Sequence, residues 1–495
     1  MQPNDHRPFR ARNRHRIAAW PIPLTLCCAL LAACVSSRGL HPQGQLTDAD
    51  SLDAGRSLAP ASLSPASWPA VDWWRELDDP QLDALIDEAL RGSPTLDAAD
   101  ARLRLAQAQA GAADAARTPT LSGTGTYIGA DNNGSYGSET RIGLGFGHAF
   151  DLWGGQRAAW EAALGQARAA GIDAQAARLT LSAAVAQSYV MLGYAWRLQD
   201  IGNDELARAE KMLELTRQRC SAGIDDMVSL RQSEAAVPAA RQQVQAARWQ
   251  IQRAQTALAA LLGQGPDRGL AIGRPRALNP ARLSVPSVLP SELLGRRPDV
   301  VAARWRVEAA GHSIRAAQAQ FHPNINLNAL VGISPQSWNL LHDSPWSGSL
   351  NPLSMGPAIS LPIFDGGRLR ANLAQSDAQY DLAVADYNGL LVSALREVAD
   401  QINTLASLDQ QIQQQSQSEA IAQAGYDLAR QRYQAGIGGY LEVLGAQQQL
   451  LSAQQRTASL QSDQIQASVR LNQALGGGYR PAAPDPKKTS AIAVH

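Results

Sequence analysis

The sequence repeats its own pattern across most of its length, and this duplication constrains the fold more than any other feature. One half contains SPTLDAADARLRLAQAQAG and the other contains RPDVVAARWRVEAAGHSIRAAQ. Prolines recur at an offset of 204 residues, Pro94 with Pro298 and Pro119 with Pro323. Each half predicts a helix, a proline stop, two strands, a very long helix, a break and a second helix. We therefore expect a first repeat over 68–280 and a second over 281–478.

Two segments lack proline for so long that they predict helices of unusual length. These segments run from Gly154 to Cys220 and from Gly366 to Gln434. Helices of this length measure roughly 100 Å, which no globular core requires. In the second segment, apolar residues alternate in steps of three and four, as in a coiled coil. They are Leu391, Leu395, Val398, Ile402, Leu405, Leu408 and Ile412. We expect long helical hairpins over 154–263 and 366–476.

The same three residues, Ala-Gly-Ile, break both long helices, 213 residues apart. Glycine suits such a break because it tolerates a positive φ. The break is explained either as a helix C-cap followed by a turn or as a contact for a partner helix, and the two can hold together. The six tip residues are Ala222, Gly223, Ile224, Ala435, Gly436 and Ile437.

Short alternating segments predict two strand pairs, within 119–150 and 323–364. Ile142, Leu144 and Phe146 alternate with glycines, and INLNALVG alternates in the same way. The polar segments 131–140 and 333–352 are expected to be loops. This pattern fits membrane strands with lipid outside and a wet lumen inside, although a half-buried soluble sheet would look the same. Because the smallest closed membrane barrels have about eight strands, several copies must share one barrel; two, three or four would close it.

The N-terminus predicts a lipoprotein. Five arginines precede the apolar stretch 17–31, and Leu-Ala-Ala-Cys follows. We expect residues 1–33 to be a signal peptide and Cys34 to carry lipid. An uncleaved anchor is disfavoured by two prolines and a span of roughly 17 residues. Residues 34–67, rich in Ser, Ala, Pro and Gly, predict an extended linker, and 479–495 a flexible tail.

Charge and motifs exclude several classes of function. Without the signal peptide the chain has 44 − 5 = 39 basic and 44 − 1 = 43 acidic groups, so it offers no basic field for nucleic acid. It contains none of the common hydrolase, phosphate-loop or zinc-protease motifs, so we expect no enzyme and no cofactor. His148 and His322 fall near strand ends, where they suit interfacial polar residues better than metal ligands.

Five motifs together resemble one family. They are WWRELDDPQLDALIDEAL, GRRPDVVAARWRVEAAGHSIRAAQAQFHPNINL, LPIFDGGRLRANL, RYQAGIGGYLEVLGAQQQLL and LNQALGGGY. With the lipidation motif and the duplication, the chain resembles the TolC-like outer-membrane factors of tripartite efflux systems, in their lipoprotein (NodT) branch. The resemblance implies a mixed α and β fold and a homotrimer. A 12-stranded transmembrane β-barrel, four strands per chain, would continue into a long periplasmic α-helical coiled-coil barrel.

The resemblance also implies a function. The protein would be lipid-anchored in the bacterial outer membrane, contact its lipid and extend into the periplasm. It would be a passive exit duct for small molecules such as drugs or aromatic compounds. Its partners would be a periplasmic adaptor protein and an inner-membrane pump. Two alternatives stay open, namely a duct for protein secretion and a periplasmic coiled-coil adaptor lipoprotein. The duplicated strand pairs argue against the adaptor.

Relatives close the periplasmic end with charged residues near the second tip. Tyr433 matches the family tyrosine and Glu442 falls where one pore Asp would be, while Gly438 and Gly445 replace an Arg and a second Asp. Asp225 and Asp226 could supply the missing charge, although a solvated turn explains them equally well. The candidate cationic partners are Arg219, Arg430 and Arg432. A carboxylate ring would favour cations.

Overall fold

The computed structural model describes residues 36–48, 51–52, 68–132, 135–278, 295–334 and 349–480, with side chains except at 128–141 and 333–353. The predicted signal peptide, Cys34 and nearly all of the predicted tail lie outside these residues. The chain divides into two compact units. One comprises 1–42, 116–158 and 314–378, and the other comprises 43–115, 159–313 and 379–495.

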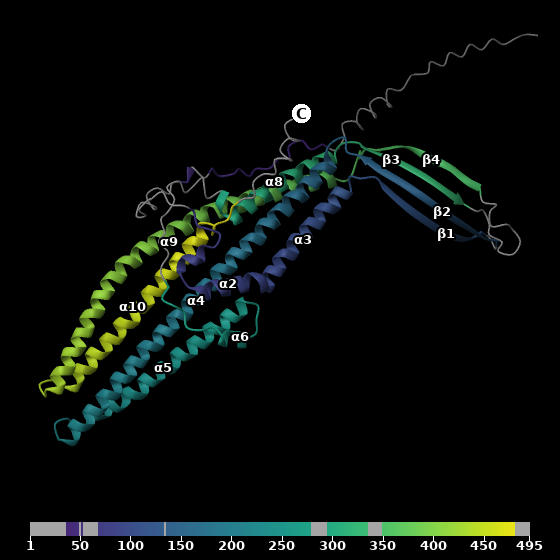
Figure 1. Cartoon of the computed structure of the whole chain (residues 1–495). Coiled ribbons are helices and arrows are strands. Elements are labelled where there is room, and N and C mark those ends of the chain that lie inside the picture. The colour runs from purple at the N-terminus through teal and green to yellow at the C-terminus, as the bar shows by residue number, and fades with distance from the viewer. Residues whose placement is uncertain are drawn as a thin grey trace, which may run out of the picture. The chain divides into compact units, whose positions relative to one another are not determined.

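Two long helical hairpins of equal size dominate the structure (Figure 1). The first is formed by α4 (Gly155–Ser221) and α5 (Met227–Leu261), and the second by α9 (Arg368–Gln434) and α10 (Tyr440–Ala474). The longer helix has 67 residues and the shorter 35 in both hairpins. Each second-hairpin helix starts 213 residues after its counterpart, since 368 − 155 and 440 − 227 are both 213. The predicted duplication is thus confirmed at the level of whole helices.

The predicted apolar seam of α9 is buried or half-buried along its length. Leu391, Val398, Ile402 and Leu408 are at most 7% exposed. Leu395, Leu405 and Ile412 pack partly buried beside α10 residues such as Leu471 and Leu460. Burying this seam removes enough apolar surface to stabilise a helix whose other faces are rich in Gln and Ser. None of the helices within the described ranges is both long and apolar enough to cross a membrane.

Shorter helices complete each repeat. The first has η2 (Trp73–Leu77), α2 (Pro80–Gly92), α3 (Pro94–Ala115) and α6 (Pro266–Leu270), and the second has α8 (Pro298–Ala319). Asp79 caps α2, because its Oδ1 accepts a hydrogen bond from the Gln81 backbone N–H at 2.9 Å. Its Oδ2 accepts hydrogen bonds from the Tyr189 hydroxyl at 2.7 Å and the Arg276 N–H at 2.9 Å. One buried carboxylate therefore joins α2, α4 and the segment after α6.

Four antiparallel strands form one sheet in the order β1-β2-β3-β4. They are β1 (Thr120–Asn132), β2 (Ser135–Phe150), β3 (Asn324–Ser334) and β4 (Ser349–Ser360). The predicted loop over 131–140 is wrong, because β1 and β2 pair as far as Asn132 and Ser135. The ends of the other predicted loop, 333–334 and 349–352, are also strand. Ladder hydrogen bonds join backbones, so a polar and glycine-rich composition does not prevent pairing.

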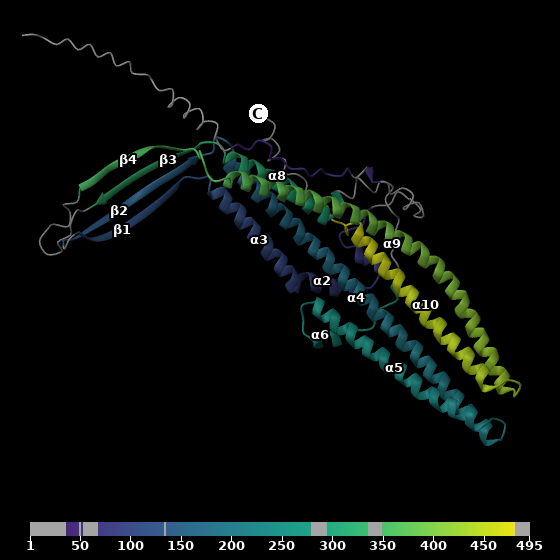
Figure 2. The same cartoon turned by 180° about the vertical axis from the view of Figure 1, so that it is seen from behind.

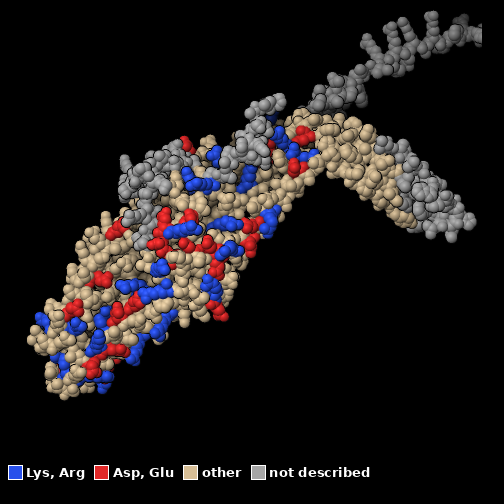
Figure 3. Space-filling view, in the orientation of Figure 1, with Lys and Arg blue, Asp and Glu red and all other residues tan. Residues whose placement is uncertain are grey.

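The two faces of the sheet differ, as the alternation predicts. Residues opposite each other in the register share a face. Leu144 lies opposite Val331, and Ile325 lies opposite Ile359, on an apolar face. Thr120, Gly147, Asn328 and Gly356 follow one another across the strands on the other face. Segments 120–127, 142–150, 324–332 and 354–360 contain no Lys, Arg, Asp or Glu, and Figure 3 shows an uncharged surface there.

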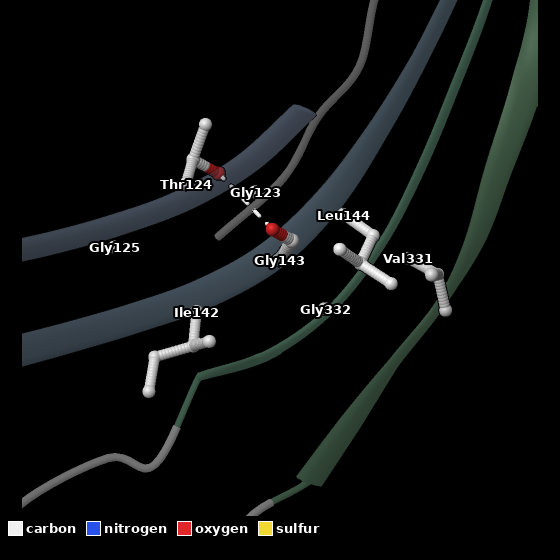
Figure 4. A pocket seen from close by; sticks show the side chains of 8 residues that line it. All are labelled: Gly123, Thr124, Gly125, Ile142, Gly143, Leu144, Val331 and Gly332. Carbon is white, nitrogen blue, oxygen red and sulfur yellow. Dashed lines mark hydrogen bonds between the residues drawn. The ribbon is translucent and has the colours of Figure 1, made fainter. Parts of the chain in front are cut away.

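A shallow hollow of about 530 Å³ interrupts the apolar face (Figure 4). It exists because Gly123 and Gly125 on β1 carry no side chains where they lie opposite Leu144 and Ile142 of β2. The Thr124 hydroxyl, which belongs to the polar face, donates to the Gly143 carbonyl at 3.5 Å. Leu144 and Ile142 are about half exposed, at 52% and 54%. This surface suits contact with hydrocarbon rather than with water.

Candidate gate and docking tips

The Ala-Gly-Ile breaks form the same helix-terminating turn in both hairpins. Gly223 has φ 73° and Gly436 has φ 79°, as predicted for positions that only glycine adopts easily. The N–H groups of Gly223 and Ile224 donate to the carbonyls of Cys220 and Arg219, at 3.0 and 2.9 Å. The second tip repeats this pattern: Gly436 donates to Tyr433 at 3.1 Å, and Ile437 to Arg432 at 3.0 Å. This is the Schellman motif, so local helix capping explains why both tips keep the same three residues.

Capping does not explain why the isoleucines are exposed. Ile224 is 62% and Ile437 69% exposed. Other large apolar side chains around the two turns are also more than half exposed, namely Met227, Val228 and Leu441. Contiguous exposed apolar groups commonly mark a protein contact. The two explanations of the breaks are therefore compatible, with the glycine serving the turn and the isoleucine left available.

One set of contacts joins the first tip to the second hairpin, and we call it the tip latch. The Arg219 guanidinium donates to both carboxylate oxygens of Asp225, at 2.9 and 3.1 Å. Its third nitrogen donates to the Tyr433 carbonyl at 2.9 Å, and the guanidinium lies 4.4 Å from the centre of the Tyr433 ring. The Tyr433 hydroxyl donates to Asp225 Oδ2 at 2.5 Å. Figures 1 and 2 show the two hairpin ends side by side.

The tip latch is largely removed from solvent, which strengthens its charged contacts. Tyr433 and Thr216 are fully buried, and the Tyr433 hydroxyl lies 3.1 Å from Thr216 Oγ1. The side chains of Arg219 and Asp225 are only 11% and 12% exposed. A hydrogen-bonded pair at such burial is worth more than a solvated surface pair, and breaking it leaves an uncompensated charge.

The protonation states of the latch support one another. The hydrogen bonds from Arg219 lower the pKa of Asp225, with a smaller contribution from Tyr433. Burial raises the pKa of Tyr433, and its hydrogen bond to Asp225 raises it further. Hydrogen bonding to Asp225 raises the pKa of Arg219. At neutral pH the latch therefore consists of a carboxylate, a guanidinium and a neutral phenol that donates a hydrogen bond to the carboxylate.

The remaining candidate gate residues lie at the surface of the tips. Arg432 and Glu442 approach only to 3.8 Å and are 49% and 56% exposed. Asp226 caps α5, since its carboxylate accepts the Ser229 N–H at 2.8 Å, and this hydrogen bond lowers its pKa. Arg430 pairs at 3.8 Å with Asp427 within α9. Of the acidic candidates, Asp225 is thus engaged between the hairpins, Asp226 caps a helix, and Glu442 remains accessible.

Sequence reasoning missed Thr216 and a second polar cluster between the hairpins. The Gln447 side-chain amide donates to Glu205 Oε1 at 2.5 Å, and both side chains are buried. Arg208 donates to Glu205 at 3.2 Å and to Gln454 at 3.2 Å. No spacing within α4 alone could have revealed this cluster, because half of its members belong to α10.

The two histidines have separate aromatic partners. His148 contacts the Phe150 ring edge-on, with the ring centres 5.1 Å apart. His322 stacks on Trp153 at 4.5 Å, and the Trp153 Nε1–H donates to the Pro323 carbonyl at 2.8 Å. Across the described ranges, no group of three or more His, Cys, Asp or Glu residues is placed to hold a metal ion.

Two duplicated strand pairs with one apolar and one polar face, each followed by a hairpin of two long helices, define the fold of an outer-membrane channel subunit. The family model "Outer membrane efflux protein" matches residues 85–264 and 289–477, one match in each repeat. The chain belongs to this family, and both fold and family are those of transport proteins.

Individual relatives agree with this assignment. The chain is 38% identical to the fusaric acid resistance protein FusA of Burkholderia cepacia, over 70% of this chain and 67% of FusA. It is 31% identical to the pyoverdine export outer membrane protein OpmQ of Pseudomonas aeruginosa, over 93% and 97%. The crystal structure of the outer membrane protein VceC of Vibrio cholerae superposes with a TM-score of 0.75 and 36% identity, covering 83% of this chain and all of VceC. The predicted fold class, efflux function and outer-membrane location are confirmed.

Proposed function

We propose that three copies of this chain form a passive exit duct in the outer membrane, closed at its periplasmic end by the hairpin tips. The observation that carries the proposal is the sheet, which has one apolar and one polar face and no Lys, Arg, Asp or Glu over 120–127, 142–150, 324–332 and 354–360. Three copies would supply twelve strands, enough for a closed barrel with its apolar face in lipid. The FusA and OpmQ names support small organic molecules as cargo, and drugs or aromatic compounds fit that class.

The exposed tip residues Ile224 and Ile437 support the docking of a periplasmic adaptor, through which an inner-membrane pump would deliver cargo. Cys34 would carry the lipid anchor. Neither the adaptor nor the pump is identified by these residues. The tip latch supports a gate, because it holds the two hairpins of one chain together and would have to open if they separate.

The duct is tested by measuring the mass of the detergent-solubilised full chain together with its conductance in planar bilayers. We expect the mass of three chains and discrete single-channel currents. A monomer without conductance would overturn the duct. A dimer or tetramer that conducts would overturn only the copy number.

Glu442 is the acidic candidate that remains accessible, and it should line the closed end. In a symmetric assembly its copies would form a ring of carboxylates that attracts cations. We expect Glu442→Gln to weaken block by divalent or trivalent cations in planar-bilayer recordings. Ser229→Ala is a suitable control, since Ser229 occupies the equivalent position of the first tip (442 − 213 = 229). Equal block of wild type and Glu442→Gln would exclude Glu442 from the pore.

A further inference from the structure

The hollow in the apolar face of the sheet contains two glycines that the sheet itself does not require. A Cβ on Gly125 would meet no atom within 4 Å, and one on Gly123 would meet only Leu144 Cδ2, at an ordinary 3.9 Å. Neither glycine has the positive φ that disfavours other residues. Because glycine in a strand interior destabilises the strand relative to alanine, its presence at both positions has another reason.

The other glycines of the hollow provide an internal comparison. A Cβ on Gly143 would lie 3.2 Å from the Val331 carbonyl oxygen, and a Cβ on Gly332 would lie 2.8 Å from the Ile142 carbonyl oxygen. β2 and β3 therefore approach each other closely enough at this point to favour glycine. Close packing between strands accounts for this pair of glycines, and it does not account for the pair on β1.

The hollow has the lining that a hydrocarbon chain requires. Its eight lining residues are four glycines, one threonine and three aliphatic residues. Ile142, Leu144 and Val331 form its walls and are exposed in the single chain (Figure 4). Wall atoms beside an unfilled space lack partners for dispersion contacts. An apolar chain lying in the hollow would supply these contacts without burying a charge.

The hollow extends too far from the edge of the sheet for a neighbouring copy of the chain to fill it. It runs from β1, an edge strand, to Val331 and Gly332 of β3. Strands lie about 4.8 Å apart, so a strand added beyond β1 would lie roughly 14 Å from β3. Side chains on paired strands reach diagonal neighbours about 7–8 Å away. A neighbouring copy would therefore reach the glycines of β1 but not the far wall.

The height of the hollow favours a lipid of the outer leaflet. Phe150 ends β2 shortly before α4 begins, and Leu144 and Ile142 precede it by six and eight residues (150 − 144 and 150 − 142). At about 3.3 Å per residue and a tilt of about 40°, they lie roughly 15 and 20 Å above this strand end. Since the apolar band of such strands is about 25 Å tall, the hollow lies in the half further from the periplasm.

We propose that the hollow is a binding site for one acyl chain of an outer-leaflet lipid. The proposal rests on the proposed function, because it requires the apolar face of the sheet to lie in the membrane. The acyl chain would take the place of the side chains that Gly123 and Gly125 lack. Met355 and Ile359 protrude from the same face, so lipid beside them stays fluid whereas the chain in the hollow is ordered.

Photolabelling in outer-membrane vesicles tests the site in the full-length protein. A phosphatidylcholine with a diazirine on one acyl chain is added to the outside of the vesicles, and mass spectrometry locates the labelled residues. Leu121 and Tyr127 bracket the hollow in height on the same face, and both are more exposed than its walls, at 73% and 66%. We expect Leu144 and Val331 to be labelled at least several-fold more than either of them.

The possible results separate this proposal from the proposed function. Equal labelling of all four residues would reduce the hollow to ordinary contact with fluid lipid and overturn the site. Labelling of Leu121 and Tyr127 without Leu144 and Val331 would mean that another copy covers the hollow, which overturns the site and leaves the duct intact. No labelling at any of the four would overturn the membrane placement of the sheet together with the site.

A filling variant tests the site from within. Gly125→Leu adds its side chain where a Cβ has open space, so the strand should still pair. We expect labelling of Val331 to fall at least several-fold, and a spin-labelled phosphatidylcholine to show one motionally restricted chain fewer per copy. Thr126→Leu, the matched control, adds the same side chain at the next position and on the opposite face, and should behave as wild type. Equal counts of restricted chains in all three proteins would overturn the site, and their detergent-solubilised masses check assembly.

Discussion

The two hairpin tips have the same backbone conformation but differ in their charged and aromatic side chains. At positions 213 residues apart, the first tip has acidic residues where the second has glycine, and a tyrosine replaces a cysteine. The pairs are Arg219 and Arg432, Cys220 and Tyr433, Asp225 and Gly438, Asp226 and Gly439, and Ser229 and Glu442. Arg219 is 11% exposed within the tip latch, whereas Arg432 is 49% exposed and 3.8 Å from its carboxylate.

This difference separates the features that both repeats retain from those that require the two repeats to differ. The turn is local, so both halves keep its Ala-Gly-Ile. The tip latch joins one half to the other and needs complementary partners, which two identical tips cannot supply. Asp225 and Tyr433 occupy positions that are not equivalent in the repeat, and only their divergence allows a carboxylate from one hairpin to accept a hydrogen bond from a hydroxyl of the other. Glu442 of the second tip takes no part in the tip latch and stays accessible to solvent.

The largest effect should come from breaking the latch at its arginine. Arg219→Ala removes three hydrogen bonds and leaves Asp225 nearly buried without its cation, a loss of about 3 kcal/mol. The equivalent change at the second tip, Arg432→Ala, removes a long, solvated pair with Glu442 and an exposed 3.4 Å hydrogen bond to the Ile437 carbonyl, with the pair worth less than about 1 kcal/mol. Planar-bilayer recordings should show a clear rise in open probability for Arg219→Ala and little change for Arg432→Ala.

Two results of these recordings would contradict the prediction. If both arginine variants open the channel equally, closure depends on the charge of the tip ring and not on the tip latch. If neither does, the latch is a structural contact without a gating role. Thermal unfolding of the helical region separates a gating effect from general loss of folding.

A smaller effect should follow from removing the tyrosine hydroxyl. Tyr433→Phe keeps the ring and loses the hydrogen bond to Asp225, worth about 2 kcal/mol for a charged acceptor. Tyr440→Phe is its control, because that ring lies 6.2 Å away in the same apolar cluster. We expect a higher open probability for Tyr433→Phe alone. An equal rise in Tyr440→Phe would assign the effect to packing.

The same contact fixes the pH range of the latch. Asp225 has a pKa below its ordinary 3.8, so its contribution is complete above that value and disappears only as pH falls through the lowered pKa. Tyr433 has a pKa raised above 10.0, so its contribution is complete below 10.0 and disappears as pH rises through the raised pKa. The difference between wild type and Tyr433→Phe should therefore be constant from about pH 4 to 10. A change near pH 6 would assign gating to other groups.

The sequence predicted most of the fold because its determinants are local or periodic. Proline stops, the apolar seam of α9, the glycine turns and strand alternation each report on neighbouring residues. The prediction failed at 131–140, where pairing with β1 overrides composition. It also could not find the tip latch. Asp225 and Tyr433 lie 208 residues apart, and nothing near Asp225 distinguishes a carboxylate that faces a pore from one that faces another hairpin.

The smallest effect should come from the helix caps, the last difference between the tips. Asp226 caps α5, whereas Gly439 begins α10 without a side-chain cap. Asp226→Ala should speed hydrogen exchange of the Ser229 N–H and its neighbours, because that donor loses its acceptor. Gly439→Asp should slow exchange at the Glu442 N–H, because a side-chain acceptor would add to the 3.2 Å hydrogen bond that this N–H makes to the Gly439 carbonyl. Neither change touches the tip latch, so open probability should stay near wild type in both. A clear opening of Asp226→Ala would mean that the first turn of α5 holds Asp225 in place, and the two tips would then differ in rigidity as well as in charge.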